Sequence, residues 1–242
     1  MRFTWPEDLT EARLVQERLA PWVCLRRLRR TPRTVAGVDA AFSENRISAA
    51  ACLYSLPDLS PLEDAEASRP LDFPYIPGYL SYREGRAILE ALAGLSQTPD
   101  LLLVDGQGIA HPRRFGIASF LGVLCGRPSI GCAKSRLVGD ACDPGRRRGC
   151  SSRLVCGSEL VGSVLRTRDG VRPVYVSPGH LIDVEGAVEL VLEMTRGFRI
   201  PEPLRRAHTM SCAAAHHRHP VSIDACPSPA SRHAGSSHPL SS

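Results

Sequence analysis

The sequence predicts an α/β protein, a single domain in which helices flank one mixed sheet. Short apolar runs alternate with segments of helical periodicity, as in such a sheet. The run at 101–104 ends on Asp105, and two glycines follow within three residues, so the backbone can turn sharply beside a carboxylate. Open α/β sheets bind ligands at the carboxyl ends of strands, although Asp105 could instead only cap the next turn. With 242 residues and 43% hydrophobic content, the chain is long enough for one such core.

An amphipathic helix is expected first, over residues 7–22. Thr10 can cap it, and the residues of its apolar face are Leu14, Val15, Leu19 and Trp22. An arginine cluster follows, made of Arg26, Arg27, Arg29 and Arg30. This cluster either contacts phosphates or forms a solvated surface.

Two apolar runs, 35–42 and 47–56, predict a hairpin of buried strands. Asp39 is the one charged residue of the first run. An ionised carboxylate in an apolar strand is costly unless a salt bridge or a cation compensates it. The polar stretch at 57–68 is expected to be a loop, with a short third strand at 69–73.

A stiff, exposed tip is expected between residues 73 and 80. Pro74 and Pro77 fix the backbone on both sides of Tyr75 and Ile76. A rigid aromatic ring of this kind suits insertion between nucleic-acid bases. The alternative is a loop that packs Tyr75 into the core.

The remaining elements follow from the same patterns. They are a helix at 80–95 that carries Glu84, the strand at 101–104, a buried helix at 115–125, a strand at 128–133, a polar loop at 140–153, a hairpin at 160–166 and 174–177, a helix at 183–195, and a last helix that begins at 203. From residue 209 the chain is rich in histidine, serine and proline and has no regular period. We therefore expect a folded domain over residues 1–208 and a disordered tail over 209–242.

Charge and cysteine usage limit the class of protein. The net charge of +5 favours a polyanionic partner. Lys134 is the one lysine among 30 basic residues, and a compact ammonium with an adjustable pKa makes it a site candidate. Nine cysteines without C-x-x-C spacing favour reduced thiols over disulfides or a zinc site. The sequence shows neither a secretion signal nor a membrane-spanning run, so we expect a cytoplasmic protein.

Three acids are expected to converge at one edge of the sheet. They meet if the strands that carry Asp39 and Asp105 are neighbours and the helix that carries Glu84 packs across them. Carboxylates this close raise one another's pKa unless a cation neutralises them. Oxygen ligands favour Mg²⁺ or Mn²⁺, and a divalent cation held by acids beside a basic surface suits phosphodiester hydrolysis.

Seven motifs, in order along residues 8–208, together resemble the endonuclease V family. They are VAGVD at 35–39, PYIPG at 74–78, YREG at 82–85, VDGQGIAHPRR at 104–114, GCAKSRL at 131–137, VSPGH at 176–180 and IPEPLRRAH at 200–208. One motif alone would be weak evidence, whereas seven in the family's order are highly specific. The resemblance implies a ribonuclease H-like fold and an endonuclease that cuts nucleic acid near deaminated bases, chiefly inosine.

The resemblance also implies roles for the acids and their neighbours. Asp39 and Asp105 would bind Mg²⁺, with Glu84 completing the set and Mn²⁺ as a substitute ion. His208 would act near a second metal position or the attacking water. Lys134 would hold the phosphate or stabilise developing charge.

A second set of residues would bind the substrate. The wedge that fills the gap left by a flipped base would be the loop of Pro74, Tyr75, Ile76 and Pro77. The family's hypoxanthine pocket matches Gly78, Leu80, Gly116 and Ile117, and His111 is counted among the substrate-binding residues. The expected cut is at the second phosphodiester bond 3′ to deoxyinosine in DNA, leaving 5′-phosphate ends. We expect a monomer.

Two departures from the family pattern stand out, and two alternatives remain open. Family members commonly carry histidine at the position of Phe120, so a polar contact behind the active site is expected to be missing. They also continue the last helix beyond the residue matching His208, which here is expected to lie on a frayed end. The alternatives to a DNA endonuclease are an inosine-specific endoribonuclease and a non-catalytic binder of damaged nucleic acid.

Overall fold

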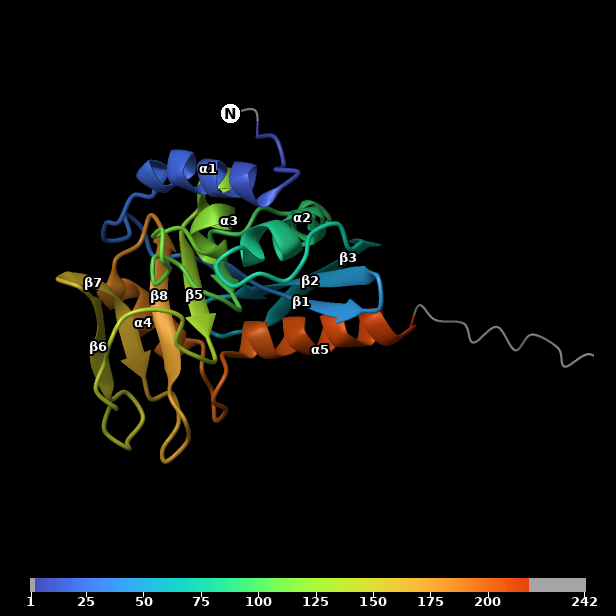
Figure 1. Ribbon diagram of the computed structural model, residues 1–242. Helices are drawn as coiled ribbons and strands as arrows, with labels where there is room; N and C mark the ends of the chain where they lie inside the picture. Colours follow the sequence, from blue (N-terminus) through green and yellow to red (C-terminus); the bar gives the residue numbers. More distant parts are fainter. Residues whose placement is uncertain (1–2, 218–242) are drawn as a thin grey trace, which may run out of the picture.

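Within residues 3–217, which the computed structural model describes, one mixed sheet of eight strands forms the centre of the molecule (Figure 1). Its strand order is β3-β2-β1-β4-β5-β8-β7-β6. The strands are β1 (Thr34–Ser43), β2 (Arg46–Ser55), β3 (Pro61–Pro70), β4 (Leu101–Val104), β5 (Ser129–Ala133), β6 (Ser151–Cys156), β7 (Glu159–Leu165) and β8 (Val174–His180). β4 pairs in parallel with both β1 and β5, and the other neighbours pair antiparallel.

Helices cover both faces of the sheet (Figure 1). They are α1 (Leu9–Leu19) with the 3₁₀ turn η1 (Ala20–Trp22), α2 (Leu80–Ala93), α3 (Ile117–Cys125), α4 (Val184–Glu193) and α5 (Glu202–His217). The first three α-helices pack in one core and the last two in the other. Alternate residues of β4 enter the two cores, so its sequence is apolar throughout. The predicted mixed sheet flanked by helices is confirmed.

Several elements match the sequence prediction closely. The hairpins expected at 35–42 with 47–56 and at 160–166 with 174–177 are β1–β2 and β7–β8. The helices expected at 80–95 and 183–195 are α2 and α4. No helix within the described residues is both long and apolar enough to span a membrane.

The first helix begins and packs differently from the prediction. Asp8, not Thr10, caps α1, because its carboxylate accepts a hydrogen bond from the Glu11 backbone N–H at 2.8 Å. The helix buries Ala12, Val15, Gln16 and Leu19, whereas Leu14 and Trp22 are exposed. The predicted face was right for Val15 and Leu19 and wrong for Leu14 and Trp22, because the helix turns Ala12 and the amide of Gln16 inward in their place.

Both edge strands depart from the prediction. β3 occupies most of the stretch expected to be a loop at 57–68, and the strand expected at 69–73 ends at Pro70. β6 begins inside the loop expected at 140–153. These strands lie at the two edges of the sheet, where much of the strand meets solvent and polar residues are tolerated. They are strands because they pair with β2 and β7, and the apolar pattern of their own sequences does not reveal this pairing.

The last helix is longer than predicted. α5 continues to His217, so the boundary expected after residue 208 was wrong for residues 209–217. Ala214 and Ala215 are buried beyond that boundary, and His208 lies in the middle of the helix rather than on a frayed end. The rest of the expected tail, 218–242, lies outside the described residues.

The start of α5 lies directly on β1. A Cβ atom built at Gly37 would lie 2.4 Å from the carbonyl carbon of Pro203, which is far inside van der Waals contact. Only glycine permits this approach of a helix to a strand. The contact fixes α5 against β1 and places His208 beside Asp39.

Phe120 lies in a cluster of aromatic rings at the centre of the α1–α3 core. Its side chain is fully buried. The ring centroids of its neighbours lie 5.4–6.2 Å away, and these neighbours are Phe3, Trp5, Tyr82 and Phe115. The position that is commonly histidine in the resembling family is therefore an apolar packing position in this chain.

Replacing Phe120 with histidine should destabilise the fold, because the imidazole would enter a shell of aromatic rings. We expect Phe120→His to lower the free energy of unfolding by about 2–4 kcal/mol. The matched Phe120→Leu change keeps the site apolar and should cost less, about 1–2 kcal/mol. Denaturant unfolding of both variants measures the difference. A histidine variant as stable as the leucine variant would reveal a polar partner in this cluster.

Candidate active site

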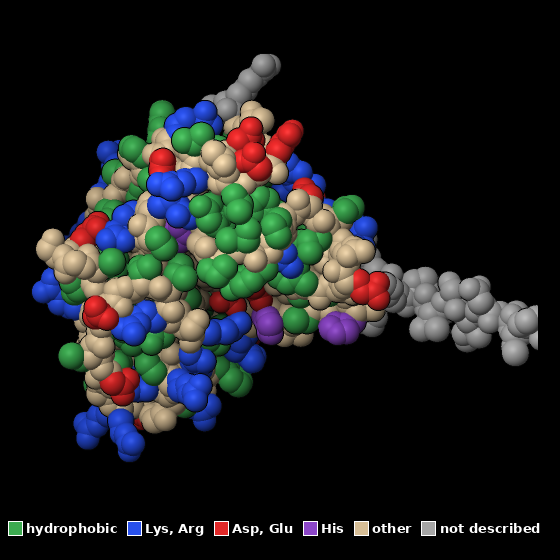
Figure 2. Space-filling view, viewed as in Figure 1, with side chains coloured by type: hydrophobic (Ala, Val, Ile, Leu, Met, Phe, Trp, Pro, Cys, Tyr) green, Lys and Arg blue, Asp and Glu red, His purple; other side chains and the backbone are tan. Residues whose placement is uncertain are grey.

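Strand pairing brings two of the predicted acids together. β1 and β4 run in parallel with Val38 opposite Val104, so Asp39 and Asp105 are the next residues on adjacent strands. Glu84 comes from the second turn of α2, which packs on β1 and β2. Figure 2 shows acidic side chains in the middle of the face that is turned to the viewer, below an apolar surface and above lysine or arginine side chains. The charges of Asp39 and Asp105 both raise the pKa of Glu84, so the three acids lie within electrostatic range of one another.

Asp39 is buried and partnered. One carboxylate oxygen accepts the Ala40 backbone N–H at 2.9 Å, and the other lies 2.7 Å from Nδ1 of His208. Burial raises the pKa of Asp39, and the nearby charge of Asp105 raises it further, while the contact with His208 lowers it. The net direction is upward, so the ionised carboxylate is held at a cost.

Glu84 is equally buried and has no such partner. Its side chain is 7% exposed, and its carboxylate makes no hydrogen bond or ion pair with any residue of the described chain. Burial raises the pKa of Glu84 well above its usual value, and the charges of Asp39 and Asp105 add to the effect. A carboxylate of this kind is stable in its ionised form only beside a positive charge.

Lys134, which follows β5 directly, forms an ion pair with Asp105. The distance between Nζ and the carboxylate oxygen is 2.5 Å. Burial lowers the pKa of Lys134, but the hydrogen bond and charge of Asp105 outweigh this effect and keep it above the ordinary value. Arg199 holds the backbone beneath, because it donates to the carbonyl oxygens of Lys134 at 2.9 Å and Pro173 at 2.8 Å.

The donor chemistry of this edge fits a hard divalent cation. Three carboxylates lie within electrostatic range of one another, two of them with raised pKa values. Oxygen-only donors with this much negative charge are typical of Mg²⁺ and Mn²⁺ sites. Within residues 3–217 no three such side chains already stand in the arrangement of ligands around one ion. The Asp105 carboxylate faces Lys134 and the Asp39 carboxylate faces His208, so cation binding requires these contacts to rearrange.

A cavity of about 300 Å³ opens beside Asp105. One wall is the proline-bounded loop together with the residues that follow it up to the start of α2. The residues that line the space there are Tyr75, Ile76, Pro77, Gly78 and Leu80. The opposite wall comes from the turn after β4 and from the segment after β5. Tyr75 is 68% exposed, so the alternative in which it packs into the core was wrong. Pro74 is exposed on the same loop.

Two predicted pocket residues lie behind this cavity rather than on its wall. Gly116 and Ile117 are buried at the start of α3. A Cβ at Gly116 would lie 2.3 Å from the carbonyl oxygen of Gln107, and a Cβ at Gly106 would lie 2.5 Å from the Ile117 side chain. Both residues therefore support the glycine turn after β4 from below.

One carbonyl group fixes the loop above the cavity. The carbonyl oxygen of Gly78 lies within 3.0 Å of three donors, Nε2 of Gln16, Nε2 of His111 and a guanidinium nitrogen of Arg113. The Arg113 guanidinium also donates to the side-chain oxygen of Gln16 and stacks over the ring of Tyr79. The loop is thus tied to α1 and to the segment that follows β4.

His111 takes a different position from the one predicted. It is 3% exposed, and both ring nitrogens contact backbone groups of the protein. Because the Gly78 carbonyl can only accept and the Arg113 N–H can only donate, the ring is neutral with its hydrogen on Nε2. Burial lowers the pKa of His111 to about 4. The residue positions the loop and presents no free group to a substrate.

Sequence reasoning missed several residues that build this site. Gln107 lines the cavity, and its amide nitrogen donates to the Ser135 carbonyl at 2.9 Å, which ties the turn after β4 to the segment after β5. Three further residues hold the site in place by donating to backbone carbonyls: Gln16 and Arg113 to that of Gly78, and Arg199 to that of Lys134. The sequence gives a weak signal only for Arg113, which follows a motif histidine; the other contacts join segments far apart in the chain.

Comparison with known proteins places these features in context. The sequence model of the family described as Endonuclease V matches residues 17–209. The endonuclease V of Geotalea uraniireducens is 54% identical over 200 residues, which cover 83% of this chain and 86% of that protein.

Solved structures show the same arrangement of elements. The endonuclease V of Streptomyces avermitilis is similar with a TM-score of 0.83 and 42% identity, covering 87% of this chain and 94% of that one. The Ciona intestinalis endonuclease V, in complex with a 23mer DNA containing an inosine followed by a ribo-adenosine, has a TM-score of 0.77 over 88% of this chain and 98% of that one. At 24% identity this second likeness concerns the fold alone. The ribonuclease H-like fold is confirmed.

The neutral state of His111 predicts a pH dependence of stability. The unfolded chain takes up a proton on this ring near pH 6.5, whereas the folded protein resists until about pH 4. Stability is therefore lost as the pH falls through this window, by about 3 kcal/mol in total from this residue. In His111→Gln the loss between pH 7 and pH 4 should be smaller by that amount, as measured by urea unfolding at each pH. Parallel curves for the two proteins would contradict the assignment.

Proposed function

Because this chain belongs to the endonuclease V family, we propose that it is a Mg²⁺-dependent endonuclease of DNA repair. The proposed reaction cleaves the second phosphodiester bond 3′ to deoxyinosine and related deaminated bases, and leaves a 5′-phosphate. One observation carries the proposal: three carboxylates, a lysine and an exposed aromatic loop converge at one edge of the sheet. The proposed substrate is DNA that contains deaminated bases, and the proposed state is a monomer in the cytoplasm.

The cation would be held by Asp39, Glu84 and Asp105. The raised pKa values of Asp39 and Glu84 support this assignment, because a positive charge would relieve their burial and mutual repulsion. Mn²⁺ has the same ligand preference and should substitute for Mg²⁺. A bound divalent ion would supply polarisation of the phosphate and neutralisation of charge on the leaving oxygen.

Lys134 is proposed to exchange partners during substrate binding. Its ammonium group pairs with Asp105 in the described structure, and its side chain is 45% exposed. A phosphate oxygen that enters the edge would offer the same charge in place of Asp105. The ammonium, whose pKa is raised, would remain protonated and stabilise the charge that develops on the phosphate.

His208 is proposed to move a proton. Its Nδ1 lies 2.7 Å from the Asp39 carboxylate, which can only accept a hydrogen bond when ionised. The hydrogen then resides on Nδ1, and Nε2 keeps a lone pair that can receive a proton from the attacking water. The side chain is 56% exposed, so water has access to it.

The loop of Pro74, Tyr75, Ile76 and Pro77 is proposed as the wedge that enters the base stack. Flipping a deaminated base costs less than flipping a normal one, since its pair is weaker. The cavity beside Gly78 and Leu80 is the proposed position of the flipped hypoxanthine. Backbone groups there could recognise its N1–H donor and O6 acceptor, which adenine lacks.

An inosine-directed endoribonuclease is the second candidate. The oligonucleotide bound by the Ciona intestinalis relative carries a ribonucleotide directly after the inosine. A 2′-hydroxyl at that position is what distinguishes RNA from DNA near the proposed cut. The chemistry assigned to the acids, Lys134 and His208 is the same for either substrate.

Cleavage of matched oligonucleotides tests the proposed function. DNA and RNA strands that carry one inosine are incubated with the protein in Mg²⁺, in Mn²⁺ or in EDTA. We expect a metal-dependent nick at the second phosphodiester bond 3′ to inosine in DNA. A nick in RNA alone would favour the second candidate. No nick in either strand, from folded protein that still binds inosine-containing strands, would favour a non-catalytic binder.

Glu84→Gln should separate stability from activity. The change removes an unpartnered buried charge, so the variant should melt at a higher temperature than the unaltered protein in EDTA. Cutting should fall by about 100-fold or more, because even groups that only orient metal ligands contribute about 10–100-fold. Glu66→Gln, an exposed acid on β3, is the matched control and should change neither quantity. Undiminished cutting by Glu84→Gln would remove Glu84 from the metal site.

A further inference from the structure

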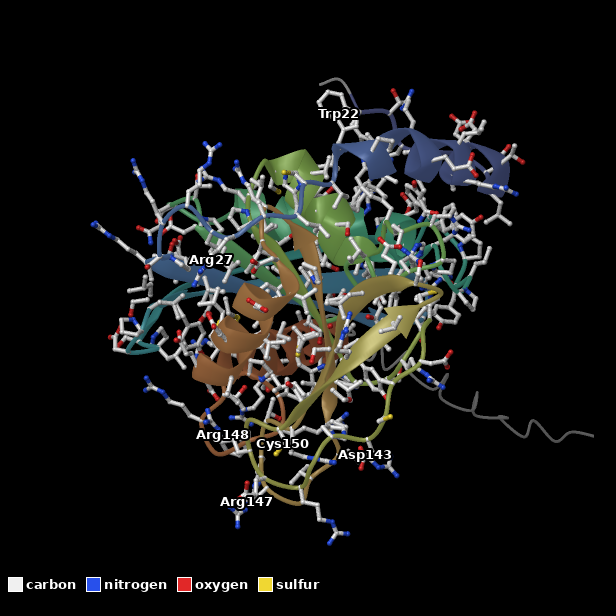
Figure 3. All side chains as sticks on the ribbon, turned by 90° about the vertical axis from the view of Figure 1, so that its left-hand side faces the viewer. Trp22, Arg27, Asp143, Arg147, Arg148 and Cys150 are labelled. Atoms are coloured by element: carbon white, nitrogen blue, oxygen red, sulfur yellow. The ribbon has the colours of Figure 1, made fainter. Side chains whose placement is uncertain are left out.

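A wide basic cavity lies at the opposite end of the sheet from the acids. Its volume is about 950 Å³, and its walls come from the segments that precede β1, β4 and β5. Five arginines line it, namely Arg26, Arg29, Arg30, Arg33 and Arg127, together with one acid, Asp100. Figure 3 shows Arg27, which belongs to the same stretch of chain, among many side chains with nitrogen ends. The proposed nuclease reaction makes no use of this group.

The charges of these five arginines are not compensated by the protein. None of their guanidinium groups makes a hydrogen bond or ion pair with another residue of the described chain. The single lining acid, Asp100, carries one negative charge against five guanidinium groups. One of its oxygens accepts the backbone N–H groups of Arg33 at 2.8 Å and Thr34 at 3.2 Å. Several arginines outside the cavity do have acidic partners, for example Arg114, which pairs with Glu159 at 2.6 Å.

This arrangement suits an extended polyanion. Guanidinium groups bind phosphate through paired hydrogen bonds, and several of them around one opening favour a ligand with several phosphates. We infer that the arginine cavity binds the phosphodiester backbone of the nucleic-acid substrate at a second position, away from the cut. The inference rests on the proposed function in one respect, namely that the polyanion is a nucleic acid.

The two positions face opposite ends of the sheet, so a substrate must pass around the molecule to reach both. Asp100 and Asp105 lie at opposite ends of β4, five residues apart, which corresponds to roughly 16 Å. Likewise, Arg127 precedes β5 on the side of the arginine cavity, and Lys134 follows β5 on the side of the acids. A strand must also pass around the molecule, so it needs many more than the roughly five nucleotides that would span 16 Å in a duplex. Binding should therefore depend on the length of the substrate.

Length-dependent binding by a charge-reduced variant tests this inference. Arg29→Gln/Arg30→Gln removes two exposed charges from the cavity. The matched control is Arg146→Gln/Arg147→Gln, which removes two exposed charges from another loop. Figure 3 labels Arg147 at the bottom of the molecule, well below Arg27. Binding of inosine-containing and undamaged DNA, about 10 and about 40 nucleotides long, is measured over a range of salt concentrations.

The cavity variant should bind the longer DNA more weakly, with a salt dependence reduced by about 1–2 in log–log slope. The difference from the unaltered protein should shrink about 4- to 16-fold when salt is raised fourfold. Binding and cutting of the short inosine substrate should not change. Equal behaviour of the cavity variant and the control on long DNA would overturn the inference.

Failure of the proposed function has a different signature. In that case the unaltered protein does not cut inosine-containing strands of either length. The salt dependence on undamaged long DNA still reports on the cavity, because it requires no cutting. A reduced salt dependence of binding in the cavity variant supports the inference even then, and an unchanged salt dependence rejects it.

Discussion

The candidate active edge depends on one electrostatic constraint, which is that three carboxylates, two of them buried, lie within electrostatic range of one another. Parallel pairing of β1 with β4 sets Asp39 beside Asp105, and α2 places Glu84 near both. The protein partners two of them, through His208 from α5 and Lys134 from the end of β5. These two groups come from elements far apart in the chain, so the packing of the whole sheet serves to bring them to the acids. A cation at this edge would compensate the negative charge that remains.

Much of the fold could be predicted because its centre has a strong local pattern. β4 and the β1–β2 hairpin are apolar on both faces, and α2 and α4 repeat apolar residues at helical spacing. The local sequence pattern does not predict a segment whose secondary structure depends on contacts with a neighbouring element. β3 and β6 are polar edge strands, and the turns of α5 beyond His208 look like tail in the sequence but bury two alanines against the protein.

The residues of the candidate site also fall into a predictable group and an unpredictable one. The three acids and Lys134 stand out in the sequence, because a carboxylate at an apolar strand and a single lysine are unusual, and family motifs surround them. The residues that hold the loop do not stand out. Gln16 reads as an ordinary helix residue, and His111 reads as a group for substrate, until the structure shows both donating to one carbonyl of Gly78. Side chains that act on backbone atoms leave almost no pattern.

The hydrogen bond between Gln16 and the Gly78 carbonyl makes the first helix part of the anchor of the loop. α1 supplies no group to the proposed chemistry, yet through Gln16 it shares the anchor of the loop that would read the lesion. Disturbance of that helix, for example by a bulky fusion partner, would loosen the reading loop while the acids and Lys134 stayed in place. Such a protein would keep its capacity for hydrolysis and lose discrimination between damaged and normal bases. Under the proposed function, fidelity would therefore depend on the anchor at the Gly78 carbonyl, and turnover on the separate contacts that hold the acids.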